Sequence, residues 1–296
     1  AIPPFSHISV AFLRYYPRLY PFLLEGQPNM IFGRGEVGKS YMACFFSSLV
    51  QSGKSVCGLE PVQGQVLYLD YETTPEEVDE RLKMLKSGLS LDGGSDFLYR
   101  PCAQPLDLDI ENIRSKVTEK SVELVVVDSA GYACGGEPES ADVALRYYRA
   151  LRSLGVTTLS IAHNTKEGNQ NLPFGSIYWY NGARNIWKLD KPQSAEADGT
   201  TIQLTHRKMN NGKRCEPLSY RFLFDDQKVT IEETDSNGTS KTYLRVQIKE
   251  VLEGGPMSRK DIVEELKANN SSVGVKLNEY KGKLFNKRED DKWELL

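Results

Sequence analysis

The sequence predicts an α/β fold, a mostly parallel sheet flanked by helices, with a small domain after it. Three observations support this. From residue 27 onward, short apolar segments alternate with amphipathic ones, as strands alternate with covering helices in parallel sheets. A glycine-rich turn at residues 33–40 joins the first strand to the first helix. Beyond the polar segment 235–240, the pattern changes to three short helices and a hairpin.

Local signals justify each element in order. Apolar runs predict strands at residues 29–32, 65–70, 97–99, 124–127 and 156–162, and a first helix at residues 40–50. Thr74 as N-cap, Pro75 at the first helical position and Glu77 predict a second helix, to about residue 88. Ser140 begins another helix, which Gly155 ends. Three β-rich segments, 201–206, 218–224 and 229–232, predict an antiparallel extension of the sheet.

Composition excludes several classes of protein. Among 296 residues, 40% are hydrophobic and 26% charged, which is typical of a globular domain. No apolar run is long enough to cross a bilayer, and the first residues lack a signal-peptide pattern, so we expect a cytoplasmic protein without a membrane partner. The five scattered cysteines indicate buried thiols rather than a disulfide frame or zinc site. A net charge of −3 leaves nucleic-acid binding to a local patch.

Residues 33–40 form a complete G-x-x-x-x-G-K-[ST] phosphate-binding loop. Its glycines let backbone N–H groups converge on a phosphate, Lys39 reaches the β and γ phosphates, and the Ser40 hydroxyl holds Mg²⁺. The following helix points its N-terminal dipole at the phosphates. The sequence therefore predicts binding of a nucleoside triphosphate with Mg²⁺. The expected nucleotide contacts are Gly33, Arg34, Gly35, Glu36, Val37, Gly38, Lys39, Ser40 and Tyr41.

Two carboxylates follow strands at positions that suit hydrolysis. Asp128 ends an apolar strand after this loop, which is typical of the Walker B aspartate that orders Mg²⁺. Glu72 follows the strand next after the loop helix, where a carboxylate accepts a proton from the attacking water or orients it. The alternatives are a solvated strand end for Asp128 and an exposed glutamate before a helix for Glu72.

Four segments together carry a resemblance to a known family. They are the loop 33–40, the strand end Tyr68-Leu69-Asp70-Tyr71-Glu72, the segment Val126-Val127-Asp128-Ser129, and Ile161-Ala162-His163-Asn164-Thr165-Lys166. Over about residues 25–232 the chain resembles the RecA-like ATPases of the plasmid replicative helicase type, the hexameric RepA group. It is similar, more distantly, to bacterial replicative helicases and RecA. The resemblance implies a RecA-like P-loop NTPase domain at residues 25–235, ATP and Mg²⁺ as ligands, a ring or filament of identical subunits with a hexamer expected, and single-stranded DNA as partner.

The resemblance also implies roles for later residues. His163 or Asn164 would sense the γ-phosphate and couple it to a DNA-contacting loop at residues 167–176; the alternatives are a structural histidine and an ordinary surface loop. In the basic hairpin 204–214, Arg207 or Lys208 would reach the γ-phosphate of the neighbouring subunit, as an arginine finger does; a solvated basic hairpin is the alternative. Related helicases have an arginine two positions after the lysine, where this chain has Asn210. For Arg184, which also matches a family arginine, a structural role is expected.

The two ends of the chain predict further contacts. Residues 1–24, rich in aromatics and proline, form an arm that packs either on its own domain or on a neighbouring subunit. Residues 242–296 predict a winged helix-turn-helix domain. There, Ser271 or Ser272 caps a third helix that runs to about residue 283. Basic side chains on this helix and the wing would meet duplex DNA phosphates, and Ser271, Ser272 and Asn278 would reach base edges; a protein-docking module is the alternative. The basic residues are Lys276, Lys281, Lys283, Lys287 and Arg288.

We therefore expect a DNA-dependent ATPase that acts as an oligomeric replicative helicase or translocase on single-stranded DNA. Two alternatives remain open at this point. One is an ATP-controlled, site-specific DNA-binding regulator or loader without unwinding activity. The other is a non-catalytic scaffold whose ATP site controls assembly. Glu72 and the basic hairpin favour hydrolysis over the scaffold, and the predicted winged helix keeps the loader open.

Overall fold

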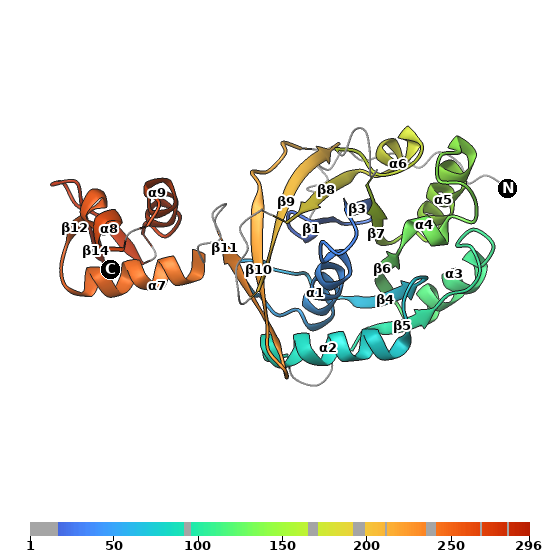
Figure 1. Ribbon diagram of the computed structural model, residues 1–296, viewed down its shortest axis with the longest axis horizontal. Helices are drawn as coiled ribbons and strands as arrows, with labels where there is room; N and C mark the ends of the chain where they lie inside the picture. The colour runs from blue at the N-terminus through green and yellow to red at the C-terminus, as the bar shows by residue number, and fades with distance from the viewer. Residues whose placement is uncertain are drawn as a thin grey trace, which may run out of the picture.

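The structure, a computed structural model, describes residues 17–91, 96–164, 171–191, 199–210, 212–234, 241–266, 268–282 and 284–296. Within them, nine strands form one sheet in the order β11-β10-β9-β8-β3-β7-β6-β4-β5 (Figure 1). The six strands from β8 to β5 are parallel, and β9, β10 and β11 continue the sheet in antiparallel pairs. This confirms the predicted α/β architecture. The strands span Pro28–Gly33 (β3), Gln65–Asp70 (β4), Leu98–Pro101 (β5), Val122–Asp128 (β6), Thr157–His163 (β7), Asn185–Asp190 (β8), Thr200–Met209 (β9), Leu218–Phe224 (β10) and Val229–Thr234 (β11).

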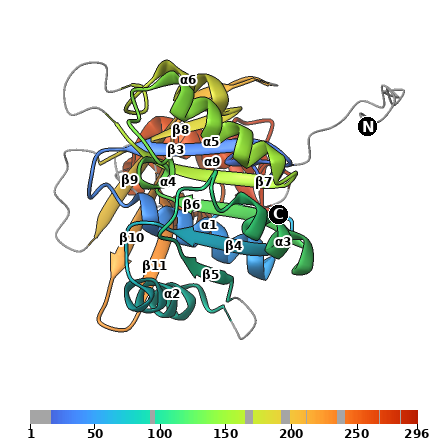
Figure 2. The ribbon, with the colours of Figure 1, turned by 90° about the vertical axis from the view of Figure 1, so that its right-hand side faces the viewer.

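Helices cover both faces of the sheet. α1 (Lys39–Ser52) and α2 (Pro75–Leu89) cover one face. α3 (Ile110–Glu119), α4 (Ala130–Ala133) and α5 (Ala141–Ser153) cover the other, which faces the viewer in Figure 2. In β6, Leu124 and Val126 belong to the first core, whereas Val125 and Val127 belong to the second. Because alternate side chains enter opposite cores, the strand reads as one continuous apolar run.

Local signals predicted the longer elements well and missed the short ones. The predicted strand at residues 65–70 is β4, and α2 begins at Pro75, with the Thr74 hydroxyl accepting a hydrogen bond from the Glu77 N–H at 3.4 Å. The helices α3, α4 and α6 (Ile177–Gly182) were not predicted. They have 10, 4 and 6 residues, too few for a helical period to stand out.

The described part of the N-terminal arm packs on its own domain. β1 (Pro17–Leu19) and β2 (Leu23–Leu24) pair in an antiparallel hairpin whose leucine side chains are buried. Between them, Phe22 stacks on Phe46 of α1, with ring centroids 4.5 Å apart. Residues 1–16 of the predicted arm lie outside the described residues.

Residues 241–296 form a small unit with its own apolar core, to which Leu244, Ile262, Leu277 and Trp293 contribute. Its sheet has the order β12-β14-β13, with antiparallel pairs. The elements are α7 (Lys241–Glu253), β12 (Met257–Ser258), α8 (Arg259–Leu266), α9 (Asn270–Glu279), β13 (Phe285–Lys287) and β14 (Lys292–Leu295). The boundary segment 235–240 and Lys283 lie outside the described residues. None of the described helices is both long and apolar enough to span a membrane.

The third helix of this unit differs from its prediction at both ends. Asn269 is the N-cap, because its side-chain oxygen accepts hydrogen bonds from the N–H groups of Ser271, at 2.8 Å, and Ser272, at 3.3 Å. The prediction that one of the serines caps the helix was therefore wrong by two or three positions. The helix ends at Glu279 rather than near residue 283.

Candidate functional site

The phosphate-binding loop joins the carboxyl end of β3 to α1, and backbone geometry requires two of its three glycines. A Cβ on Gly33 would lie 2.5 Å from the carbonyl oxygen of Leu189 in the neighbouring strand β8. Gly38 has a φ of 91°, which L-residues with side chains rarely adopt, and it is the N-cap of α1. The loop therefore keeps its backbone N–H groups clear of side chains at the start of a helix, as an anion site requires.

Lys39 interacts with both carboxylates that the sequence predicts for the site. Its side chain is buried, and Nζ donates a hydrogen bond to the carbonyl oxygen of Arg34 at 2.7 Å. Burial lowers the pKa of Lys39, while the carboxylates of Glu72 and Asp128 oppose that shift. The three charged residues named from sequence, which come from three different segments, thus act on one another in the structure.

Asp128 is held at the end of β6 by two hydroxyl donors. The Tyr68 hydroxyl of β4 donates to Oδ2 at 2.7 Å. Burial raises the pKa of Asp128, and the hydrogen bonds from Tyr68 and Ser40 oppose that shift. The peptide bond that follows, to Ser129, is cis. Ser40 and Asp128 together present hard oxygen donors. Such a pair suits Mg²⁺, which takes one or two protein oxygens and completes its shell with phosphate oxygens and water.

Glu72 approaches this centre from the turn after β4. Its Oε1 lies 3.8 Å from Nε2 of His163, at the end of β7. The nearby His163 side chain lowers the pKa of Glu72; burial opposes this, and Ser129 and Lys39 add to the lowering. The carboxylate therefore stays ionised, as an acceptor for a proton from water must be.

Asp70 positions Glu72, and sequence reasoning missed it. Its buried carboxylate accepts hydrogen bonds from the N–H groups of Glu72, at 2.9 Å, and Thr73, at 3.0 Å. The hydroxyls of Thr73 and Tyr99 also donate to it. These bonds fix the turn that carries Glu72. The signal available in the sequence was an aspartate two residues before the glutamate, a spacing typical of an Asx turn.

The end of β7 connects the phosphate loop to a later segment. The backbone N–H of Asn164 donates to the carbonyl oxygen of Gly33 at 3.3 Å, and the carbonyl of His163 accepts from the N–H of Phe174 at 2.8 Å. Within the described residues, the buried Nδ2 of Asn164 has no hydrogen-bond partner. Of the predicted channel loop at residues 167–176, only residues 171–176 are described.

Tyr41, the last expected nucleotide contact, packs in an aromatic group beside the loop. Its ring meets those of Phe222 and Phe224 edge to face, with centroids 6.4 and 5.3 Å away. The guanidinium of Arg81, from α2, lies 5.0 Å from the centroid of the Tyr41 ring. These three neighbours fix the side chain that follows Ser40, and none of them was singled out from sequence.

The side chain of Lys208 forms hydrogen bonds within its own chain. Its Nζ donates to the carbonyl oxygens of Tyr180, Asn181 and Ala183 at 2.8, 3.2 and 2.8 Å, which closes the carboxyl end of α6. Burial lowers its pKa, and Arg184 and Arg152 add to that effect. The proposal that Lys208 reaches a neighbouring subunit is therefore corrected, because its ammonium group already serves three carbonyls.

Arg207 occupies a bulge in β9. Along the pairing of β8 with β9, Ile186 faces Lys208 and Trp187 faces His206, so that Arg207 is the extra residue between them. A bulge turns its residue away from the regular direction of the strand. Arg207 is partly exposed, and it is the candidate that remains for a contact with a neighbouring subunit.

The fold and this site together define a P-loop ATPase, an enzyme class that binds ATP, usually with Mg²⁺. Comparison with known families gives the more particular assignment. Residues 12–169, more than half of the chain, match the family described as AAA domain, and the chain belongs to it. No curated protein matches the chain. The family membership supports ATP hydrolysis by this protein.

Proposed function

We propose that this protein is an oligomeric ATP-driven helicase or translocase of the RecA-like, RepA type that acts on single-stranded DNA. The observation that supports it best is the double role of His163. Its side chain approaches Glu72 in the ATPase site, and its carbonyl accepts from Phe174 of the following segment. A change in bonding to the γ-phosphate that moves Glu72 is therefore transmitted to Phe174 through one residue.

The segment after Phe174 has the side chains that single-stranded DNA needs. Phe174 and Tyr178 are 41% and 40% exposed, and Ile177 beside them is 52% exposed. Bases stack on exposed aromatic rings without regard to sequence, at about 1–3 kcal/mol per base. A motor that moves along a strand requires this kind of tolerant contact.

Hydrolysis follows from the residues around the phosphate loop. Lys39 neutralises the β and γ phosphates of bound ATP, and Ser40 and Asp128 hold its Mg²⁺. Glu72 accepts the proton of the attacking water. Arg207, in the β9 bulge, would stabilise transition-state charge in the neighbouring subunit. An active ring, for which we propose six subunits, would then share each site between two copies.

The C-terminal unit supports a second candidate, a DNA-binding regulator or loader. Its order of helices and strands fits a winged helix-turn-helix, with α9 as the recognition helix. Ser271, Val275 and Asn278 are exposed on α9 at helical spacing, and Val275 is 55% exposed. An apolar side chain between two polar ones is suited to a thymine methyl group among base edges. This surface supports recognition of duplex DNA.

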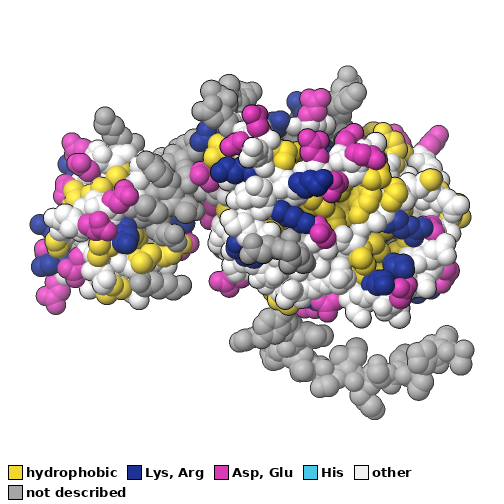
Figure 3. Space-filling model, turned by 90° about the horizontal axis from the view of Figure 1, so that it is seen from below, with side chains coloured by type: hydrophobic (Ala, Val, Ile, Leu, Met, Phe, Trp, Pro, Cys, Tyr) yellow, Lys and Arg dark blue, Asp and Glu magenta, His cyan; other side chains and the backbone are white. Residues whose placement is uncertain are grey.

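The basic residues expected on this surface are fewer than the sequence predicted. Lys276 is buried, its Nζ lies 2.9 Å from Glu279, and it faces the Tyr280 ring. It is therefore removed from the predicted phosphate contacts. Arg288 is exposed but lies 3.1 Å from Glu294. On the face shown in Figure 3, basic and acidic side chains are interspersed rather than gathered by sign.

A DNA-stimulated ATPase assay tests the motor proposal. We expect single-stranded DNA to accelerate ATP hydrolysis, and the double substitution Phe174→Ala with Tyr178→Ala to weaken DNA binding and abolish the acceleration. Tyr20→Ala is the matched control, because Tyr20 is an aromatic residue 58% exposed on the N-terminal hairpin. Forked-duplex unwinding measured on the same preparations separates the helicase from the loader. Equal stimulation of the double variant and the control would contradict the proposal.

A further inference from the structure

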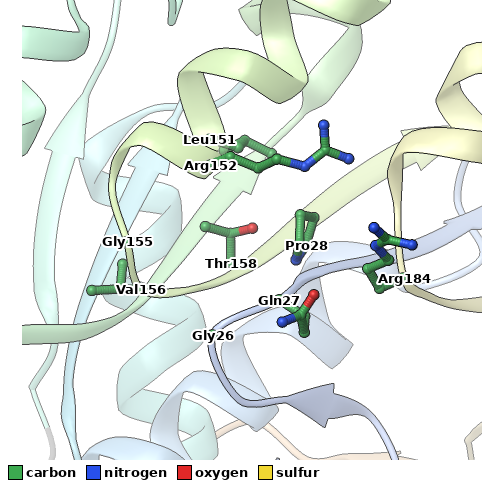
Figure 4. A pocket seen from close by; sticks show the side chains of 9 residues that line it. All are labelled: Gly26, Gln27, Pro28, Leu151, Arg152, Gly155, Val156, Thr158 and Arg184. Atoms are coloured by element: carbon green, nitrogen blue, oxygen red, sulfur yellow. The ribbon is translucent and has the colours of Figure 1, made fainter. Parts of the chain in front are cut away.

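A cavity of about 260 Å³ lies at the amino-terminal edge of the sheet, opposite the nucleotide site. β3 and β7 begin beside it and end at the phosphate loop. β3 has six residues, and at about 3.3 Å per residue it separates the two edges by about 20 Å. The cavity is lined by Gly26, Gln27, Pro28, Leu151, Arg152, Gly155, Val156, Thr158 and Arg184 (Figure 4).

Two arginines from different elements meet at this cavity. Arg152 lies in the last turn of α5, and Arg184 precedes β8. In Figure 4 their guanidinium groups lie on the same side as the Thr158 hydroxyl. Arg152 is held in place by a hydrogen bond from Nη2 to the carbonyl oxygen of Gly182, at 2.9 Å, and by the Tyr148 ring, whose centroid is 5.7 Å away. The positive charges of Arg152 and Arg184 also contribute to the lowered pKa of Lys208 nearby.

Negative charge is missing around these arginines in the described part of the chain. There, no carboxylate forms an ion pair with Arg152 or Arg184, and the nine residues that line the cavity include no acidic one. Both arginines are exposed, so solvent weakens the repulsion between them, and an anion placed at the cavity would be attracted by both.

Thr158 supplies an independent sign of a ligand. Its side chain is 1% exposed, and among the described residues its Oγ1 has no hydrogen-bond partner. The backbone of the same residue is fully engaged: its N–H donates to Gln27 at 3.2 Å, and its carbonyl accepts from Asn29 at 3.1 Å. A buried hydroxyl without a partner is unfavourable unless something else bonds to it. The cavity that Thr158 lines is where such a partner would fit.

We propose that this cavity binds the phosphate group of a small ligand, with Arg152, Arg184 and Thr158 as donors. Guanidinium groups pair with phosphate oxygens through two parallel hydrogen bonds, and the threonine hydroxyl adds a third donor group. The volume lies just below the range of pockets for drug-sized molecules, which favours inorganic phosphate or a small phosphate ester over a polymer. The inference is independent of the proposed action on DNA.

Binding of inorganic phosphate to the Lys39→Ala protein tests the site, because that background removes the main phosphate contact of the loop. We expect saturable binding by calorimetry and a rise of the unfolding midpoint with phosphate concentration. Arg184→Gln in this background should weaken phosphate binding by at least about tenfold. Arg184→Lys should weaken it by less, since lysine keeps the charge but lacks the two parallel N–H donors of the guanidinium group. Arg149→Gln is the matched control, because Arg149 is exposed on α5 and does not line the cavity.

Thr158→Val separates a ligand-binding role from a structural one. The two side chains have nearly the same volume, and valine removes an unpartnered polar group. We expect weaker phosphate binding with an undiminished unfolding midpoint in the absence of phosphate. Absence of saturable binding in the Lys39→Ala protein, or equal affinity in Arg184→Gln, would overturn the proposal. Displacement of phosphate by a short oligothymidylate would overturn the assignment to a small ligand, and loss of oligomers without a change in phosphate affinity would assign the arginines to a second copy of the chain.

Discussion

The carboxyl edge of the central sheet and the C-terminal unit both carry many charged residues, but they arrange them differently. At the sheet edge, Lys39, Asp128 and Glu72 come from three segments, and burial strengthens the interactions between them although it disfavours the charged forms of Lys39 and Asp128. In the C-terminal unit, exposed basic side chains such as Arg288 lie beside acidic neighbours, where solvent and salt weaken them. Charges that converge in a buried site carry chemistry, so single substitutions there are expected to have much larger effects.

The largest effect is expected at Arg207. If this residue completes the site of a neighbouring subunit, Arg207→Ala should lower kcat by about 10³-fold or more, because Lys39 and Mg²⁺ alone would then offset the transition-state charge there. Mixing Arg207→Ala chains with Lys39→Ala chains should restore part of the activity, since some interfaces would then carry both intact residues. Steady-state ATPase assays of the mixture and of each variant alone provide the measurement.

Lys208→Met is the control for that experiment. Lys208 serves the carbonyls at the end of α6, so its loss should lower the free energy of unfolding by about 1–3 kcal/mol while kcat stays close to that of the unaltered protein. If the mixture of Arg207→Ala and Lys39→Ala chains stays inactive although oligomers form, Arg207 acts within its own subunit or not at all.

Glu72→Gln is expected to lower turnover by about 10²-fold or more, because glutamine cannot accept the proton of the attacking water. ATP affinity should be retained, since the contacts of the phosphate loop remain. Equilibrium binding of ATP measured beside single-turnover hydrolysis distinguishes the two effects. A parallel fall of affinity and turnover would show that Glu72 maintains the structure of the loop instead.

The pH dependence of kcat/KM tests the assignment of Glu72 as the general base. The nearby His163 side chain lowers the pKa of Glu72, so the carboxylate stays ionised, and active, to a lower pH than an isolated glutamate. In His163→Ala the pKa of Glu72 rises, and the acid limb of kcat/KM should move to higher pH. An unchanged acid limb in His163→Ala would mean that Glu72 does not act as the base.

Site residues could be predicted from the sequence where the signal lies within one short segment of the chain. The phosphate loop is contiguous, and Asp128 and Glu72 follow apolar strands, so all were predicted from short segments. Asp70 was missed because its partners are backbone N–H groups and Tyr99, which only the folded turn brings together. Arg207 and Lys208 were equivalent in the sequence. The structure distinguishes them, because Arg207 lies in a bulge and Lys208 bonds three carbonyls of α6 and the residue after it. The sequence around the two residues shows neither feature.

The same limit applies to the fold. Strands such as β3, β4 and β6 could be recognised because both of their faces are buried, whereas no range was predicted for β8, and α4 and α6 are single turns or little more. The two arginines of the cavity at the amino-terminal edge are 32 residues apart, from Arg152 to Arg184, and no sequence motif joins them. Their proximity follows from where α5 ends and β8 begins, which is a property of the assembled sheet.

The smallest effect is expected in the C-terminal unit, where the comparison began. If this unit binds duplex DNA, replacing the exposed Lys281, Lys287 and Arg288 by glutamine should flatten the slope of log K against log salt concentration by about 0.9 for each phosphate that is no longer neutralised. Lys276→Gln should leave that slope unchanged, because its side chain is buried beside Glu279 and Tyr280. Val275→Ala should instead alter preference between DNA sequences, since base-edge contacts carry that information. Equal slopes for the triple variant and the unaltered chain would make the unit a protein-docking module and leave single-stranded DNA as the nucleic-acid partner of the ATPase domain.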